Sequence, residues 1–408
     1  MKNDTMCPSW IFIGMLILVA AVSPLGINLY LPSMPAMAHA LGVDFAAVQL
    51  SLSLYLAAVA AGQLVVGPLS DHYGRRPVLL VGLTLFVAGS LVCMLAPDTV
   101  WLNLGRIVQG LGGCAGIALS RAIVRDLYDR QRAASMIGYV TMGMAVAPMF
   151  APTIGGVLEA AIGWRAAFAF LAAFGAVTLV LVAVLLHETL PRVRAARAAA
   201  AQSAAAVPPA PAPGLLAGYA VLLRSRVFWG YAMTTAFTSG VFYAFIAGAA
   251  FVVIELMGRS PIEYGMYFGA VAFGYIVGNF ITARFGMRLG QSRVIRLGLL
   301  SSPVFLLVMA AMFAVGWMHP LVMFGPMFAV GAANGLVMPG TIAGAVSVRP
   351  DAAGAASGLA GSLQIGLGAL IAPFVGAIMG STVWPLVASM LVVSLLAIGA
   401  FSFTARAR

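Results

Sequence analysis

The stretch GPLSDHYGRRP, from Gly67 to Pro77, decides the fold because it is a short charged hinge between two long apolar segments. From Thr5 to Ser70 the only formal charge is Asp44, and then one acid, Asp71, and two arginines arrive together. A tight charged loop between two membrane-length apolar segments predicts an aqueous turn that joins two membrane-spanning helices.

The composition extends this prediction to the whole chain. Hydrophobic residues make up 62% of the 408 residues, charged residues only 8%, and the mean hydropathy is +1.04. Soluble domains carry about a quarter charged residues, and each spanning helix needs about 20 apolar ones. We therefore expect an all-α membrane protein with twelve transmembrane helices, at about residues 10–32, 45–69, 77–95, 100–124, 133–158, 165–186, 227–257, 261–283, 294–317, 320–348, 352–380 and 383–404.

A repeated pattern divides these helices into two pseudo-symmetric bundles of six. The hinge sequence DHYGRR at 71–76 has a degenerate echo, ARFGMR, at 283–288, and APTIG at 151–155 echoes APFVG at 372–376. The Arg-, Ala- and Pro-rich run between the repeats lacks the residues of a buried core. We expect a six-helix bundle at 1–187, a cytoplasmic Pro/Ala-rich tether at 188–225 and a second six-helix bundle at 226–408.

The net charge of +11 indicates orientation rather than nucleic-acid binding. Every Lys and Arg except Arg106, Arg165 and Arg259 falls on one side of the predicted helices. This bias places the arginine-rich side in the cytoplasm, so both termini are expected there. The three cysteines cannot pair fully and are expected to be free and packed.

Arg106 is the strongest single candidate for function. It lies within the predicted fourth helix, and Gln109 shares its face because it is three residues further on. Ionisable groups inside a span are costly and usually mark a transport pathway. The alternative is an arginine that reaches to the membrane surface with its charged head.

Polar and aromatic side chains within the spans supply a candidate pocket. Apolar walls with a few oriented polar groups suit a small neutral amphiphile, whereas plain hydrogen bonding between helices explains each residue about as well. Glu255 lies towards the end of a span, where an interfacial position and proton carriage are equally good interpretations. The substrate-binding candidates are Asn28, Tyr30, Tyr55, Gln63, Gln109, Tyr139 and Tyr231.

No enzyme signature is present. The four histidines are scattered without metal-ligand spacing, the serines lack a partner base, and no phosphate-binding glycine loop with a lysine occurs. We therefore expect neither an enzyme nor a protein that holds a metal or cofactor.

Three of these motifs resemble motifs of the major facilitator superfamily. The hinge resembles its signature loop, which implies a cytoplasmic gate. The sequence Arg-x-x-Gln-Gly at Arg106 resembles its fourth-helix motif, which is linked to proton coupling. The fifth predicted helix resembles the antiporter motif of drug exporters, with an alanine where glycine is commoner. The implied gate residues are Asp71, Gly74, Arg75 and Arg76, and the antiporter-motif residues are Pro148, Pro152, Gly155 and Gly156.

Further stretches resemble the Bcr/CflA branch of drug-resistance transporters. They are NLYLPSMP at 28–35, QLSLSLY at 49–55 and AFVVIE at 250–255. The resemblance implies a monomeric secondary transporter of the bacterial inner membrane that exports small, mostly neutral drugs of the phenicol or bicyclomycin type. The resemblance also implies that export is driven by proton antiport, with Arg106 and Glu255 as the coupling candidates.

One departure keeps alternatives open. Members of this branch often have an acid where this chain has Asn28, and asparagine cannot bind and release a proton at physiological pH. An exporter or facilitator of a small metabolite, such as an amino acid, without tight proton coupling is therefore the main rival. A non-transporting membrane sensor is a second rival. The sequence does not identify the substrate.

Overall fold

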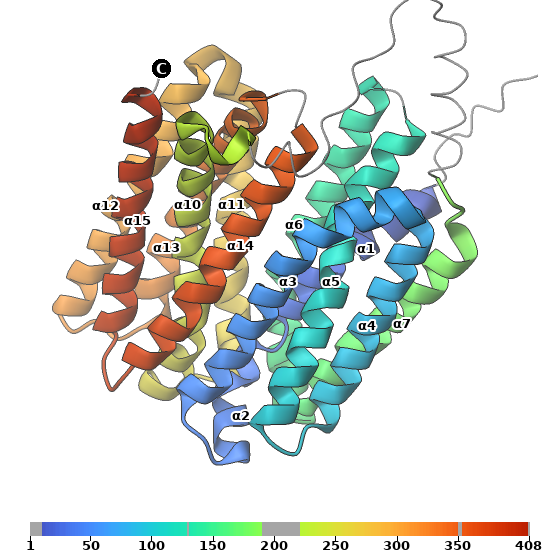
Figure 1. Cartoon of the computed structure of the whole chain (residues 1–408). Coiled ribbons are helices and arrows are strands. Elements are labelled where there is room, and N and C mark those ends of the chain that lie inside the picture. The colour runs from blue at the N-terminus through green and yellow to red at the C-terminus, as the bar shows by residue number, and fades with distance from the viewer. Residues whose placement is uncertain (1–9, 129, 190–220, 350–352, 407–408) are drawn as a thin grey trace, which may run out of the picture.

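The computed structural model describes residues 10–128, 130–189, 221–349 and 353–406, and almost all of them are helical (Figure 1). The first part of the chain forms α1 (Trp10–Asn28), η1 (Leu31–Ser33), α2 (Met34–Leu41), α3 (Phe45–Tyr73), α4 (Arg75–Leu95), α5 (Thr99–Leu127), α6 (Arg130–Ala161) and α7 (Arg165–Leu185). The second part forms α10 (Arg226–Phe251), η2 (Val252–Leu256), α11 (Pro261–Leu289), α12 (Gln291–Ala314), α13 (Pro320–Ser347), α14 (Ala353–Ile378) and α15 (Trp384–Arg406).

The predicted all-α membrane architecture is confirmed. In the described part of the chain, eleven helical segments are long and apolar enough to cross a membrane. A twelfth long helix, α6, runs for 32 residues and carries a shorter apolar stretch, Val146–Ala161. Because a spanning helix of about 20 residues satisfies all its backbone hydrogen bonds internally, this is the form that an apolar chain takes in lipid.

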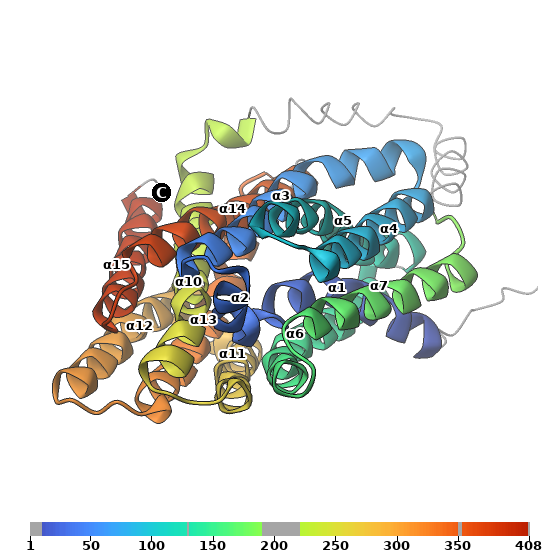
Figure 2. The same ribbon diagram turned by 90° about the horizontal axis from the view of Figure 1, so that it is seen from below.

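The long helices form two groups that lie side by side, α1 to α7 and α10 to α15 (Figures 1 and 2). We call the end that carries Arg75 and Arg288 the basic end, and the opposite end the α2 end. The end of α15 lies at the basic end, and so do the described residues that flank the predicted tether. Residues 190–220, most of that tether, lie outside the described residues, so the proposed domain boundaries stay a prediction.

Glycines bring α4 and α5 close enough to fix the polar side chains between them. A Cβ on Gly112 would lie 2.3 Å from the Phe86 nitrogen, and one on Gly89 would lie 2.4 Å from the Gln109 nitrogen. Small residues of this kind permit close helix approach in membranes, where apolar side chains gain little by leaving lipid.

The first predicted span differs from the prediction. It was expected to continue to Pro32, but α1 ends at Asn28 and a turn of 3-10 helix, η1, follows. The reason is that Pro32 and Pro35 lack the backbone N–H that would continue the helix, and each begins a new helical segment instead. The residues after the first predicted span, which include His39, consequently form the short helix α2 rather than a loop.

The two groups of helices contact each other from the α2 end to about the middle of the molecule. At the α2 end the rings of Phe45 and Phe251 lie 5.0 Å apart. Near the middle, the Ser362 hydroxyl donates to the Ala60 carbonyl at 2.6 Å. Towards the basic end, a Cβ on Gly67 of α3 would meet nothing within 4 Å. The described contacts therefore close the α2 end rather than the basic end.

Candidate functional site

Arg106 lies at the centre of the first bundle and is fully buried. This excludes the interpretation in which its guanidinium reaches the membrane surface. Its neighbours come from α1, α3, α5 and α7, so the side chain is enclosed by the bundle rather than placed at its edge.

The end of α1 supplies the first partner of this charge. Arg106 Nη1 donates to the Gly26 carbonyl oxygen at 3.0 Å. The carbonyl groups in the last turn of a helix lack intrahelical donors and carry the negative end of the helix dipole. Because α1 stops at Asn28, the guanidinium meets both a free acceptor and a favourable partial charge.

Two tyrosine rings cover the guanidinium. The Arg106 Cζ atom lies 4.3 Å from the ring centroid of Tyr30 and 4.1 Å from that of Tyr55, and Phe168 is further away at 6.0 Å. Aromatic faces attract a desolvated cation. The Tyr55 hydroxyl donates to the Ser23 carbonyl oxygen at 3.2 Å, which fixes that ring over Arg106.

A chain of hydrogen bonds fixes the orientation of Gln109. Its Oε1 accepts from Arg106 Nη1, and its Nε2 donates to the Ser90 hydroxyl at 2.7 Å. Ser90 in turn donates to the Phe86 carbonyl oxygen at 2.7 Å. Gln109 therefore presents its carbonyl, not its amide, to the cation.

Some buried hydrogen-bond donors and acceptors at this site have no partner among the described residues. Arg106 Nε and Nη2 and the Asn28 Oδ1 atom are buried without a hydrogen-bond partner among the described residues. No carboxylate pairs with Arg106 there, and no Asp or Glu is among the buried polar residues of the described chain. A buried donor that is left unpaired is costly, so this arrangement is suited to a polar group that enters from outside the chain.

The structure brings together only some of the predicted binding residues. Arg106, Gln109, Tyr30 and Tyr55 are in contact. Tyr55 belongs to α3, and α3 contacts the other bundle through the hydrogen bond from Ser362 of α14 to the Ala60 carbonyl. Asn28 lies in the last turn of α1, where its Nδ2 donates to the Pro24 carbonyl at 2.8 Å. The cluster therefore lies on the side of the first bundle that faces the second.

The remaining predicted binding residues lie elsewhere. Gln63 faces α14, since a Cβ on Gly361 would lie 2.9 Å from its Oε1 atom. Tyr231 packs against Phe401 in the second bundle, with ring centroids 6.4 Å apart. Tyr139 is 41% exposed on α6. None of these three is in a described contact with Arg106.

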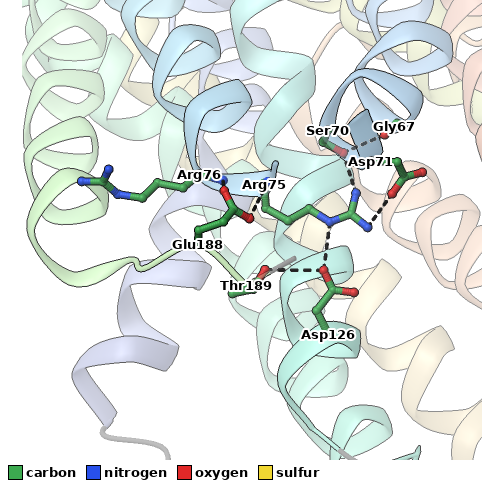
Figure 3. A network of polar contacts seen from close by, with 8 residues as sticks. All are labelled: Gly67, Ser70, Asp71, Arg75, Arg76, Asp126, Glu188 and Thr189. Atoms are coloured by element: carbon green, nitrogen blue, oxygen red, sulfur yellow. Dashed lines mark hydrogen bonds and ion pairs between the residues drawn. The ribbon is translucent and has the colours of Figure 1, made fainter. Parts of the chain in front are cut away.

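The hinge forms a second polar cluster at the basic end (Figure 3). Arg75 lies at its centre, with its Nη2 2.7 Å from Asp71 Oδ1 and its Nε 2.9 Å from Asp126 Oδ2. The Asp71 side chain is 57% exposed, whereas those of Arg75 and Asp126 are each 10% exposed. Arg76 points away and donates to the Ala183 carbonyl at 2.8 Å. These described contacts lie within the first bundle.

Glu188 holds the start of α4. Its two carboxylate oxygens accept from the backbone N–H groups of Arg75 and Arg76, at 2.9 and 3.1 Å. The first N–H groups of a helix have no intrahelical acceptor, and the negative charge of a carboxylate there also interacts favourably with the helix dipole. Gly74 has φ 105°, and a Cβ on it would lie 2.4 Å from Glu188 Oε2, so glycine is required for this approach.

The predicted antiporter-motif residues lie on α6, where Pro148 and Pro152 are inside the helix. A Cβ on Gly155 would lie 1.7 Å from the Leu29 carbonyl oxygen of the segment after α1. A Cβ on Gly156 would lie 2.4 Å from the Pro261 carbonyl oxygen of α11, in the other bundle. The two glycines therefore let α6 pack closely against a segment of its own bundle and also against α11 of the second bundle.

Glu255 lies at the α2 end, and its described contact is with His39 rather than with Arg106. Its Oε1 atom is 3.2 Å from His39 Nε2, with side chains 32% and 74% exposed respectively. This pair connects η2 of the second bundle to α2 of the first. It is one of the contacts that close the α2 end.

Comparison with known proteins identifies the family. The Major Facilitator Superfamily model matches residues 16–260. The chain belongs to the major facilitator superfamily. It is therefore a multi-pass membrane protein and a secondary transporter, not an enzyme.

Relatives within the superfamily cover nearly the whole chain. The "Uncharacterized MFS-type transporter YdgK" of Bacillus subtilis is 34% identical, with 95% of this chain and 92% of that protein covered. The "Bicyclomycin resistance protein homolog" of Haemophilus influenzae is 27% identical, with 95% of each chain covered. The "Chloramphenicol resistance protein" of Pseudomonas aeruginosa is 29% identical, with 93% and 87% covered.

Solved structures show the same superfamily fold. The xylose transporter XylE from E. coli aligns with a TM-score of 0.71 at 14% identity, covering 97% of each chain. A bacterial homolog of the human lysosomal transporter Spinster aligns with a TM-score of 0.70 at 17% identity, covering 99% of this chain and 96% of that one.

Sequence reasoning missed several residues of both clusters. Gly26, Ser90 and Phe168 complete the surroundings of Arg106, and Asp126, Glu188 and His39 complete the ionic contacts. Asp126 offered one signal, because it is one of two acids in a predicted loop that also holds three arginines, RDLYDRQR at 125–132.

Proposed function

We propose that this superfamily member exports small amphiphilic drugs of the phenicol or bicyclomycin type by alternating access, in antiport with protons. The observation that carries the proposal is the fully buried Arg106, with unpaired donors and two tyrosine faces. A molecule with an aromatic ring and neutral carbonyl or hydroxyl groups matches those donors and faces. The drug-resistance names of two relatives agree with this chemistry.

The proposed site comprises Arg106, Gln109, Tyr30, Tyr55 and Asn28. Its position between α1 and α3, the helix that contacts the second bundle, is consistent with a pathway through the middle of the molecule. Asn28 Oδ1 supplies an acceptor in addition to the two arginine donors. Such a mixed set suits a neutral substrate, because a small number of oriented polar groups can fix its orientation in an apolar site.

The orientation follows from the charges. We propose that the basic end lies in the cytoplasm and that both termini are cytoplasmic, because short loops rich in arginine remain on that side. The membrane is the bacterial inner membrane, and the transporter acts as a monomer. With the described contacts concentrated at the α2 end, the structure corresponds to a state closed to the outside.

We assign the two ionic clusters to the two gates. Asp71 is the exposed member of the Arg75 cluster, so we assign it to the gate that closes the basic end. The contact of Glu255 with His39 supports a role in closing the outer end. Proton carriage by Glu255 stays a prediction.

A rival function has one specific observation in its favour. Asn28 stands where a carboxylate is usual, and the described core holds no buried Asp or Glu. Facilitated export of a small metabolite, without proton coupling, needs no such carboxylate. Arg106 and its tyrosines would then bind a substrate carbonyl or carboxylate group.

Purified protein in liposomes distinguishes the two functions. A pH gradient is imposed with the membrane potential clamped at zero, and movement of labelled chloramphenicol is followed. Gradient-driven accumulation that is lost in Arg106→Ala is expected for proton antiport. Movement only down the drug's own gradient favours the facilitator, and no movement of the drug refutes the proposed substrate class.

A further inference from the structure

A group of arginines without acidic partners among the described residues lies at the basic end of the second bundle. Arg284 and Arg288 belong to the last two turns of α11, Arg293 and Arg296 belong to the first two turns of α12, and all four are exposed. Among the described residues none of them forms an ion pair. Arg296 Nε donates to the Ser292 carbonyl at 3.2 Å, within its own helix.

The sequence offers these arginines almost no acid. After Glu263 the chain contains a single acidic residue, Asp351. The corresponding hinge of the first bundle is different, because Arg75 is paired with Asp71 and Asp126 there. In the second repeat, Ala283 occupies the place of Asp71. Among the residues that the structure describes, the second hairpin therefore has no acidic partner of its own.

An exposed apolar stripe leads to the arginines along α11. Phe273, Phe280, Arg284 and Arg288 recur at spacings that keep them on one face of a helix. Phe273 is 50% exposed and Phe280 is 66% exposed. The opposite face, which carries Phe268, is buried in the core.

The second helix of the hairpin repeats this arrangement. Arg293 is followed on the same face by Leu297, Leu300, Val304 and Leu307, which are 56–57% exposed. Gly290, with φ 82°, forms the one-residue connection that joins the arginine-bearing ends of the two helices. Each stripe is therefore apolar along its length and cationic where it reaches the hairpin.

We propose that the α11–α12 hairpin is a binding site for an anionic phospholipid of the adjoining leaflet. The phosphate group lies between the guanidinium groups of α11 and α12, and the acyl chains follow the two apolar stripes. Planar guanidinium groups donate in pairs to phosphate oxygens, and basic surfaces at the cytoplasmic ends of spanning helices attract anionic lipids. Membrane orientation alone explains why arginines lie here, but it does not explain why acids are missing.

Titration of the full-length protein in detergent tests this site. Native mass spectrometry measures binding of phosphatidylglycerol to the wild type, to Arg288→Gln/Arg293→Gln and to a control, Arg224→Gln/Arg226→Gln. The control removes the same charge from exposed residues at the start of α10. We expect about thirtyfold weaker binding in the hairpin variant, because each of the two arginines removed contributes about 1 kcal/mol near an anionic membrane, and unchanged binding in the control.

Three results would overturn the proposal. They are equal binding of phosphatidylcholine by the wild type, equal losses in the hairpin variant and its control, and full competition by inorganic phosphate at the concentration of the lipid. Phe280→Asn tests the acyl-chain stripe separately, because it leaves the charge unchanged. It is expected to weaken phosphatidylglycerol binding several-fold, and an unchanged affinity would remove the acyl-chain part of the proposal. Gel filtration of each variant confirms that it is folded.

Discussion

Arg75 and Arg106 are both buried arginines of the same bundle, but their surroundings are opposite. Arg75 is paired with two carboxylates and a serine hydroxyl. Arg106 has a carbonyl, an amide oxygen and two aromatic faces, with no carboxylate among the described residues. The difference indicates that the charge of Arg75 is used within the protein, whereas part of the hydrogen-bonding capacity of Arg106 is held for another molecule.

The largest expected effect is on transport when Arg106 is removed. Arg106→Ala, and also Arg106→Lys, should reduce the initial rate of chloramphenicol export at least about a hundredfold, because a lysine cannot reproduce the planar donors or their stacking. The rate is measured in the liposomes described above. Arg165→Ala is a matched control, since Arg165 also stacks on an aromatic ring, at 4.1 Å from Trp164, and donates to a carbonyl, that of Ala96, at 3.0 Å. A similar loss in the control would remove the special role of Arg106.

The next effect is on stability at the basic end. Asp126→Asn should lower the free energy of unfolding by about 2 kcal/mol, because among the described residues it leaves the buried Arg75 with the exposed Asp71 as its one charged partner. Thermal unfolding in detergent measures the change. Thr189→Ala is the control, since it removes only a 3.5 Å contact with the same carboxylate. Equal stability of Asp126→Asn and the wild type would show that the buried ion pair does not hold the hinge.

A smaller effect is expected at the start of α4. Glu188→Ala should destabilise the helix end by about 1 kcal/mol, because two backbone N–H groups and the helix dipole lose their acceptor. Hydrogen exchange at the amides of Arg75 and Arg76 should become faster. Glu188→Gln retains an acceptor oxygen and should show a smaller change, so equal exchange in both variants would contradict the capping role.

The smallest stability effect is expected for Asp71. Asp71→Asn should change the free energy of unfolding by less than about 1 kcal/mol, because surface ion pairs contribute little. Export should nevertheless slow several-fold while drug affinity is retained, since the gate is distant from the proposed binding site. Parallel measurement of affinity and transport rate tests this. A loss of affinity in proportion to transport would show that the gate assignment is wrong.

The sequence predicted one cluster better than the other. Arg106 and Gln109 were recognised together because they are three residues apart on one helix, and Tyr30 and Tyr55 because polar aromatic residues are unusual within apolar spans. The same reasoning selected Tyr231 and Tyr139, which lie elsewhere, because residue type does not show which helix faces which. Only the folded bundle supplies that information.

The acidic partners of Arg75 at the hinge could not be predicted from the sequence in this way. Asp126 and Glu188 meet Arg75 across separations of 51 and 113 residues, and no periodicity connects positions so far apart. The break after Asn28 was also missed, although Pro32 and Pro35 carried a signal for it. The fold itself was predictable, since twelve apolar segments with a one-sided arginine bias allow few other structures.

The adjacent glycines of α6 have a further consequence for the balance between conformations. Gly155 lets α6 touch the carbonyl of Leu29 in its own bundle, whereas Gly156 lets it touch the carbonyl of Pro261 in the other bundle. A single methyl group at residue 156 would obstruct this contact with Pro261, and therefore the state in which the α2 end is closed. Each 1.4 kcal/mol of such obstruction shifts the ratio of inward-open to outward-open molecules about tenfold. The alternating cycle can thus be tuned by one carbon atom, at a distance from any group that holds substrate.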